Sequence, residues 1–151
     1  MSKHRILLVD DEREIRDFLT VMARHDDLEF THASNGEEGL RSILSDEFDC
    51  VVSDIKMPRL SGFEMLKAAR AQGQDVPMVF ISAFATEEIE HEVANYGAVK
   101  LLHKLELHKV KERILEAIEL GDAIRAMRQS SDQMGADFIQ LMNHSKTGPK
   151  K

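Results

Sequence analysis

The sequence has little cysteine, proline or glycine and no tryptophan: its 151 residues include one Cys, three Pro and eight Gly. A single cysteine excludes a disulfide framework and a cysteine-based metal cluster. The low Pro and Gly content excludes collagen-like and low-complexity chains. No apolar run approaches the roughly 20 residues that cross a bilayer, and the N-terminus lacks a signal-peptide core. We therefore expect a cytoplasmic protein without membrane insertion.

An excess of positive charge is also absent, because the formal net charge is −7. The acidity lies in residues 1–104, which carry a net −8, whereas residues 105–151 carry +1. A field of that sign disfavours broad binding to a phosphate backbone. The segment after residue 120 is also too short to hold a helix-turn-helix or winged-helix reader. DNA is therefore not an expected partner.

The composition that remains is that of one globular domain, with 42% hydrophobic and 31% charged residues. Short apolar runs alternate with stretches of helical period, which predicts βαβ units around a parallel sheet. The runs are nearly continuous, as expected when helices cover both faces of the sheet. The predicted fold is a doubly wound α/β sandwich with five parallel strands, at Ile6–Val9, Glu29–Ala33, Cys50–Ser53, Met78–Ile81 and Val99–Leu102.

Capping residues predict where the helices begin. Asp11 and Glu14 have the spacing of an N-cap and its capping-box partner before a first amphipathic helix. Ser61 and Glu64 have the same spacing before a later helix. A fifth helix is expected to begin near His108.

Polar residues follow four of the five apolar runs directly or nearly so. Asp10 and Asp11 follow the first run, Asp54 the third, Ser82 the fourth and Lys104 the fifth. Because sites in open parallel sheets form beyond the carboxyl ends of the strands, we expect these side chains to converge.

Three crowded carboxylates repel one another, and a hard divalent cation relieves that repulsion best. Mg²⁺ suits oxygen ligands and shares phosphoryl oxygens readily. A cation, an ammonium and a hydroxyl around a carboxylate are also what phosphoryl transfer requires. The pattern therefore predicts that Asp54 is a nucleophile that forms an acyl phosphate, with Ser82 and Lys104 beside it.

Four motifs in order carry a family resemblance: ILLVDDE at 6–12, VVSDIKMPRLSG at 51–62, FISA at 80–83, and Lys104 at a strand end. Together they resemble the response-regulator receiver domain of two-component signalling, and in particular the chemotaxis receivers. The resemblance covers residues 1–120, which we interpret as a stand-alone receiver. It implies a flavodoxin-like fold with strand order 2-1-3-4-5 and a site at the topological switch point.

The resemblance also implies roles for these residues. Asp54 would accept a phosphoryl group from a sensor histidine kinase or phosphotransfer protein, and a downstream protein target would read the result. Asp11 and Asp54 would hold Mg²⁺ with the backbone carbonyl of Lys56, and Asp10 would hold a metal-bound water. A receiver is not an enzyme with an external substrate, although it assists its own phosphorylation and dephosphorylation.

Two further roles concern the phosphoryl group itself. Ser82 would donate a hydrogen bond to it and shift towards it, and Lys104 would pair first with Asp54 and then with the phosphate.

Leu101 occupies the position where receivers carry the aromatic switch residue, so the usual aromatic movement is absent. Lys104 is followed by Leu105 where receivers carry a cis proline, and we expect a trans peptide because a non-proline cis bond costs about 3 kcal/mol. Phe84 would shade the phosphoryl group from water.

Apolar residues spaced alternately four and three apart continue beyond the receiver, over residues 121–143. The spacing is typical of a coiled-coil seam or of a helix that meets a partner groove. Gly121, Gly135 and residues 130–132 weaken a helix, so both a continuous helix and a hairpin are open. One hypothesis for this segment is homodimerisation or target binding controlled by phosphorylation, and the alternative is a helix that covers the protein's own surface. Residues 144–151 are expected to be disordered. The seam, broken only by Ser131, comprises Leu120, Ile124, Met127, Met134, Phe138 and Leu141.

Two other functions fit part of this pattern. A degenerate receiver would keep the carboxylates but bind its partners regardless of phosphorylation, because Leu101 and Leu105 depart from the family pattern. A phosphatase of the haloacid dehalogenase type also forms an aspartyl phosphate, but it uses a second Asp two residues after the nucleophile. Lys56 stands at that position here, so the proton shuttle for turnover is missing.

Overall fold

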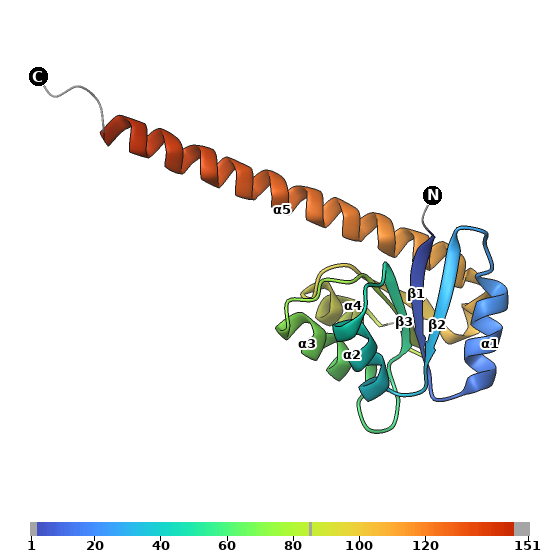
Figure 1. Ribbon diagram of the computed structural model, residues 1–151. Helices are drawn as coiled ribbons and strands as arrows, with labels where there is room; N and C mark the ends of the chain where they lie inside the picture. The colour runs from blue at the N-terminus through green and yellow to red at the C-terminus, as the bar shows by residue number, and fades with distance from the viewer. Residues whose placement is uncertain (1–2, 85, 147–151) are drawn as a thin grey trace, which may run out of the picture. The chain divides into compact units, whose positions relative to one another are not determined.

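The computed structural model describes residues 3–84 and 86–146, with side chains described as far as residue 143. Five strands alternate with helices along the chain (Figure 1). The strands are β1 (His4–Val9), β2 (Leu28–Ala33), β3 (Cys50–Asp54), β4 (Met78–Ser82) and β5 (Val99–His103). The helices are α1 (Arg13–Met22), α2 (Gly36–Ser45), α3 (Gly62–Ala71), α4 (Glu87–Ala94), a 3₁₀ helix η1 (Lys104–Lys109) and α5 (Val110–Lys146).

The strands form one parallel sheet in the order β2-β1-β3-β4-β5, which confirms the predicted fold class and strand order. The chain starts in β1, moves outwards to β2 and then crosses back to β3 on the other side of β1. The direction of winding therefore reverses between β1 and β3. In open α/β sheets, the crevice at such a reversal is where ligands bind.

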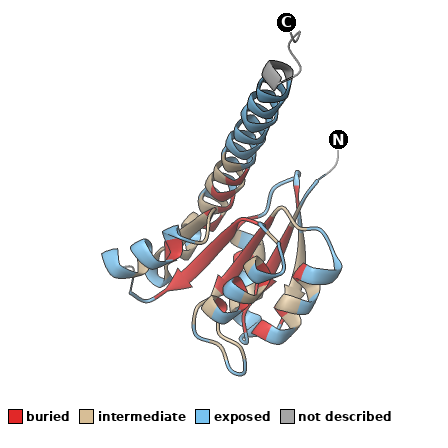
Figure 2. Cartoon of the chain, turned by 90° about the vertical axis from the view of Figure 1, so that its left-hand side faces the viewer, coloured by how far each residue is buried: buried red, intermediate tan, exposed pale blue. Residues whose placement is uncertain are grey.

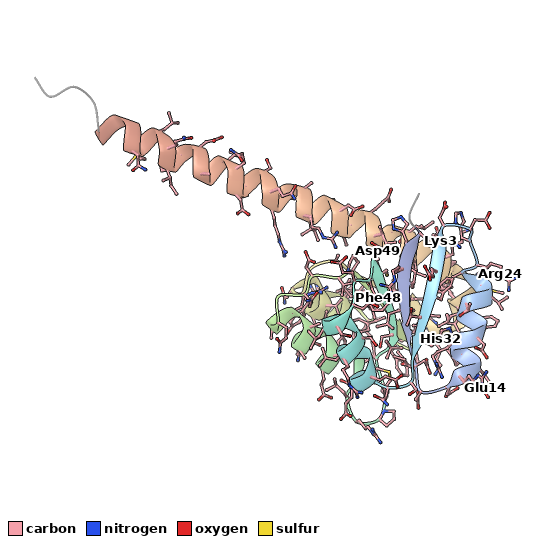
Figure 3. The ribbon with its side chains drawn as sticks, viewed as in Figure 1. Lys3, Glu14, Arg24, His32, Phe48 and Asp49 are labelled. Atoms are coloured by element: carbon pink, nitrogen blue, oxygen red, sulfur yellow. The ribbon has the colours of Figure 1, made fainter. Side chains whose placement is uncertain are left out.

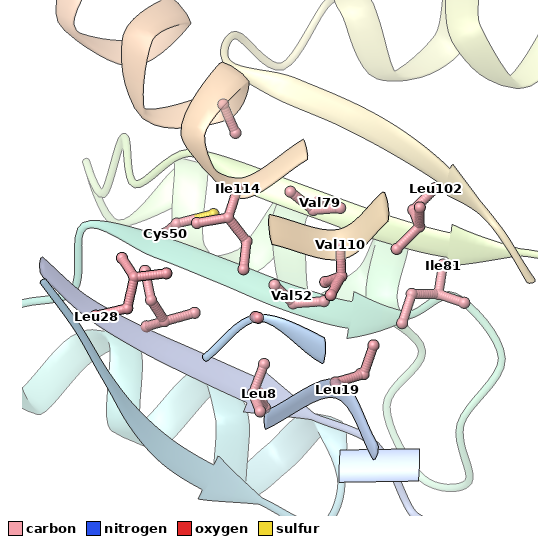
Figure 4. Close-up of a cluster of buried hydrophobic side chains, with 13 residues drawn as sticks. Leu8, Leu19, Leu28, Cys50, Val52, Val79, Ile81, Leu102, Val110 and Ile114 are labelled. Carbon is pink, nitrogen blue, oxygen red and sulfur yellow. The ribbon is translucent and has the colours of Figure 1, made fainter. Parts of the chain in front are cut away.

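Both faces of the sheet are buried, which explains the continuous apolar runs. On one face, Leu8 and Val52 pack against Leu19 of α1 and Ile114 of α5 (Figure 4). Cys50 is fully buried in this layer, and burial raises the pKa of its thiol. The other face packs against α2, α3 and α4 through a second cluster that includes Leu7, Val9, Val51, Met65, Leu66 and Phe80. The central strands β1, β3 and β4 are mostly buried, as the red strands of Figure 2 show.

The capping box before α3 is confirmed: Glu64 N–H donates to Ser61 Oγ at 3.2 Å, and the Glu64 carboxylate accepts from Ser61 N–H at 3.3 Å. The cap predicted for α1 is wrong. That helix begins at Arg13 with Glu12 as N-cap, without a side-chain hydrogen bond, and Glu14 lies exposed in its first turn (Figure 3). Asp10 Oδ1 instead accepts from Glu12 N–H at 2.8 Å.

The contacts divide the chain into two compact units, Met1–Gly121 and Asp122–Lys151. Helix α5 spans residues of both and is continuous through Gly121 and Gly135, so the chain does not form the hairpin. Helix α5 extends to Lys146 and so includes residues 144–146, and the predicted disorder of residues 144–151 stays a prediction. Residues 147–151 lie outside the described part.

Within residues 3–84 and 86–146, no helix combines the length and apolar character needed to cross a bilayer.

Candidate functional site

The register of β1 with β3 brings two of the predicted carboxylates to the same edge. Val9 at the end of β1 pairs with Ser53 of β3, so Asp10 and Asp54 each follow directly after this pair. On the other side of β3, Asp54 pairs with Ile81 of β4. The strand ends therefore place Asp10 and Asp54 on neighbouring strands at the reversal of the winding.

The register of β4 with β5 extends the same edge. Ser82 ends β4 directly after the residue that pairs with Asp54, and Ser82 itself pairs with His103. Lys104 is the next residue after His103 and begins η1. The carboxyl edge of the sheet thus carries four of the five predicted residues, Asp10, Asp54, Ser82 and Lys104, at the ends of four neighbouring strands. The fifth, Asp11, follows Asp10 and is exposed.

Asp10 is the most perturbed acid at this edge. Its side chain is only 2% exposed, and its pKa is raised to about 6, chiefly because burial disfavours the charged form. The hydrogen bond from Glu12 N–H opposes that shift, whereas the charges of Asp54 and Asp11 add to it. Burial therefore dominates the raised pKa of Asp10, and the neighbouring carboxylates predicted from the sequence add to it.

A divalent cation fits the chemistry of these donors, because the carboxylates of Asp10, Asp11 and Asp54 are oxygen ligands that repel one another. In the described part of the chain, no three His, Cys, Asp or Glu side chains form a ready cluster for a metal ion. Mg²⁺ requires fewer side chains, since it keeps several waters. The ligand roles of the three carboxylates and of the Lys56 carbonyl remain predictions.

The loop after Asp54 folds back onto the strand that it leaves. Asp54 is partly exposed and its Oδ1 accepts a hydrogen bond from Lys56 N–H at 3.2 Å. Gly62 N–H donates to the carbonyl of Ile55 at 2.8 Å, which closes the loop. A Cβ at Gly62 would lie 2.5 Å from the Asp54 carbonyl oxygen and 2.9 Å from the Phe80 ring. The sequence does not indicate this role of Gly62, because no spacing rule shows that the backbones of Gly62 and Asp54 approach each other so closely.

The hydroxyl of Ser82 is held by the loop between β4 and α4. Ser82 Oγ donates to the Phe84 carbonyl at 2.8 Å and accepts from Phe84 N–H at 3.0 Å. Ser82 is buried, whereas the Phe84 side chain is 69% exposed. The sequence placed both residues near the site, but the hydrogen bonds between them depend on a loop conformation that periodicity does not specify. The shading role of Phe84 remains a prediction.

Lys104 is exposed and begins η1. In the described residues its ammonium forms no ion pair with Asp54, so the predicted first pairing with the Asp54 carboxylate is not observed. The later pairing with the phosphate remains a prediction. No cis peptide occurs in the described part, which confirms a trans bond before Leu105. His103 Nδ1 accepts a hydrogen bond from Leu105 N–H at 3.0 Å. A proline at position 105 could not donate this hydrogen bond, because it has no backbone N–H. The backbone after Lys104 therefore has a conformation that depends on Leu105.

Leu101 lies on β5, half-buried against the second core cluster. It lines an open hollow of about 410 Å³ together with residues of α4, β5 and α5 that include Val99, Val93 and Arg113. The predicted role of Leu101 in switching has no test in this geometry and remains a prediction.

Comparison with known proteins identifies the family of this chain. The family model of the response regulator receiver domain matches residues 6–119. A solved receiver domain of the Francisella response regulator 1452 superposes with a TM-score of 0.71 at 26% identity and covers 78% of this chain and 98% of its own. The chemotaxis response regulator CheY4 of Vibrio cholerae superposes with a TM-score of 0.68 at 28% identity and covers 78% of this chain and 99% of its own.

Among curated proteins, the response regulator SaeR of Staphylococcus aureus is 28% identical over 142 residues. That match covers 93% of this chain but only 61% of SaeR, so the chain spans less than two thirds of this relative. The family model covers most of the chain and matches the strands whose ends carry Asp10, Asp54, Ser82 and Lys104. The chain therefore belongs to the response regulator receiver domain family of two-component signalling.

Proposed function

We propose that the protein accepts a phosphoryl group on Asp54, with Mg²⁺ bound at the carboxylate edge, and that this changes its contacts with other proteins. The donor would be a sensor histidine kinase or a phosphotransfer protein. The observation that carries the proposal is the register, which sets Asp10, Asp54, Ser82 and Lys104 on four consecutive strands at the reversal of the winding. No turnover of an external substrate is expected.

In the proposed reaction, a carboxylate oxygen of Asp54 attacks phosphorus and the bond from phosphorus to the donor nitrogen breaks, so the donor imidazole leaves with its proton. Asp54 is partly exposed and therefore accessible to a donor. Bound Mg²⁺ would supply positive charge to the transferring oxygens, held by Asp11, Asp54 and the Lys56 carbonyl with water on Asp10. Lys104 directly follows the end of β5 and forms no ion pair with Asp54 in the described structure, so its ammonium is available to the new phosphate.

Ser82 would connect the phosphate to the rest of the protein. A hydroxyl has one proton, and in this structure Ser82 gives it to the Phe84 carbonyl. Donation to a phosphoryl oxygen would break that hydrogen bond and release the Phe84 backbone. The loop between β4 and α4 would then change conformation, and this is the contact surface that a downstream protein would read.

Intact mass spectrometry tests the proposal. The full chain is incubated with acetyl phosphate in the presence and absence of Mg²⁺, alongside Asp54→Asn and the control Asp26→Asn, whose exposed side chain lies in the loop before β2. We expect wild type and Asp26→Asn to gain one phosphoryl group only with Mg²⁺, and Asp54→Asn to gain none. Uptake that is equal in all three proteins, or absent from wild type, would contradict the proposal.

Hydrogen exchange of the loop between β4 and α4 separates the two alternatives. We expect the Phe84 amide to exchange faster after phosphorylation, because Ser82 Oγ no longer accepts from it in the same geometry. Uptake of phosphate without any change in exchange would favour the degenerate receiver. Release of phosphate from small esters over many turnovers would favour the phosphatase.

A further inference from the structure

The outer part of α5 exposes a row of large apolar side chains. Within Asp122–Lys151, Met127, Met134, Phe138 and Leu141 are 72%, 70%, 63% and 70% exposed. Figure 2 shows this part of α5 in the colour of exposed residues. Exposed apolar rows of this kind mark interaction sites in soluble proteins. The proposed phosphoacceptor chemistry makes no use of them.

The row has the period of a two-helix interface. The seam residues alternate at spacings of four and three over a helix that the structure shows as continuous. This heptad spacing keeps one stripe of an α-helix facing a parallel partner helix in a left-handed supercoil. Ser131 occupies one seam position, and a single polar layer of this kind fixes the register of paired helices at some cost in stability.

The residues beside the seam permit pairing with a second copy of the chain. Flanking positions normally select partners by opposite charges. Here, in a parallel pair, Ala123 would face Arg128, Ser130 would face Gly135, and Asp137 would face Met142 of the other helix. None of these pairs joins like charges, so self-pairing meets no repulsion. None offers a charged pair that would select a different partner.

The area available is sufficient for a specific contact. The four seam side chains from Met127 to Leu141 expose on the order of 500 Å² per helix, so two copies would bury up to on the order of 1,000 Å², about the least that a specific interface needs. A pair of identical helices also forms a closed two-fold contact that ends the assembly at two chains.

We propose that the chain forms a homodimer through a parallel, in-register coiled coil of Leu120–Leu141, irrespective of the phosphorylation of Asp54. The dimer reaches an equilibrium with monomers that depends on protein concentration. The coiled coil links two receiver domains, so a protein with two binding sites for the receiver could bind both copies at once. This association is independent of the proposed function, because it uses no residue of the carboxylate edge.

Sedimentation equilibrium of the full chain is the first test. We expect wild type and Asp54→Asn to be dimers at high micromolar concentration, and Met134→Asp to be a monomer, because a charge in the seam is desolvated on pairing. Gln129→Asp is the matched control, since exposed position 129 lies on the opposite side of the helix, and it should remain a dimer. Met134 is exposed, so its substitution removes no packing from the receiver core. A monomeric wild type, or a dimer that survives Met134→Asp, would overturn the proposal.

Disulfide formation tests the parallel register. The native Cys50 is fully buried, so wild type should form no intermolecular disulfide under mild oxidation. Met127→Cys should form a disulfide with itself across the parallel seam, because identical seam positions face each other. Gln129→Cys, on the opposite side of the helix, should not. Equal cross-linking of both variants, or none in Met127→Cys, would exclude the parallel seam.

Discussion

At the residue scale, the site places a destabilising charge in the fold. Asp10 is almost fully buried beside Asp54 and Asp11, and its pKa is raised to about 6. Its ionised form is therefore less favourable in the folded protein than in the unfolded chain. Sites that bind cations keep such charges because the cation later neutralises them.

Asp10→Asn should therefore stabilise the magnesium-free protein. The substitution removes the buried charge, and the Asn side-chain oxygen can still accept from Glu12 N–H. A pKa raised from 3.8 to about 6 predicts an increase of ~2–3 kcal/mol in the free energy of unfolding at pH 7.5. Urea denaturation in a chelator measures it, and Mg²⁺ should reduce the difference by stabilising the wild type.

The pH dependence gives this prediction a second check. At pH values well below 3.8 the Asp10 carboxyl is protonated in both folded and unfolded states, so the variant should have no advantage there. Between pH 4 and pH 6 the unfolded chain loses its proton first, and the advantage of Asp10→Asn should grow. Above pH 6 it should be constant. An advantage that grows instead as the pH falls would contradict the assigned pKa.

Residues differ in how far the sequence specifies their role. Asp54 and Ser82 were predictable because each ends an apolar run, and the edge of a parallel sheet collects such ends. The hydrogen bond from Ser82 to Phe84 and the one from Leu105 to His103 were not, because both depend on loop dihedral angles. Asp11 was assigned to a helix cap on spacing alone, although Glu12 takes that position in the fold.

At the element scale, helix α5 contains two glycines that have opposite surroundings. A Cβ at Gly121 would lie 2.5 Å from Pro77 Cγ, in the segment before β4, whereas a Cβ at Gly135 would meet nothing within 4 Å. From the sequence alone, both glycines indicate a weak point in a helix. Only the fold shows that Gly121 is required for the close packing of α5 against Pro77. The rigid proline ring cannot move away from an added Cβ without a cost in free energy.

Alanine at these two positions should have opposite effects. Gly121→Ala should lower the free energy of unfolding of the receiver by about 1–2 kcal/mol, because the steric overlap exceeds the gain in helix propensity. Gly135→Ala should stabilise the outer helix by about 1 kcal/mol, seen as slower hydrogen exchange of its amides. Urea denaturation of Gly121→Ala supplies the first value. Stabilisation by Gly121→Ala would mean that α5 does not approach Pro77 closely.

At the scale of the whole molecule, the sheet order and the site follow from one pattern. Apolar runs buried on both faces, each followed by a polar residue, specify a parallel sheet with a functional edge. The continuity of α5 was not specified, since Gly121, Gly135 and the serines near 130 predicted a hairpin as readily as a helix. The helix propensities of single residues are weak, and tertiary packing often overrides them.

The most direct test of the central claim is to locate the phosphoryl group chemically. After treatment with acetyl phosphate and Mg²⁺, borohydride reduces an acyl phosphate to the alcohol, so phosphorylated Asp becomes homoserine. Peptide mass spectrometry of wild type should find homoserine at position 54 and at no other Asp, and none when Mg²⁺ is chelated. Homoserine at Asp10 or Asp11, or a phosphate that survives borohydride on a Ser or His, would contradict the account.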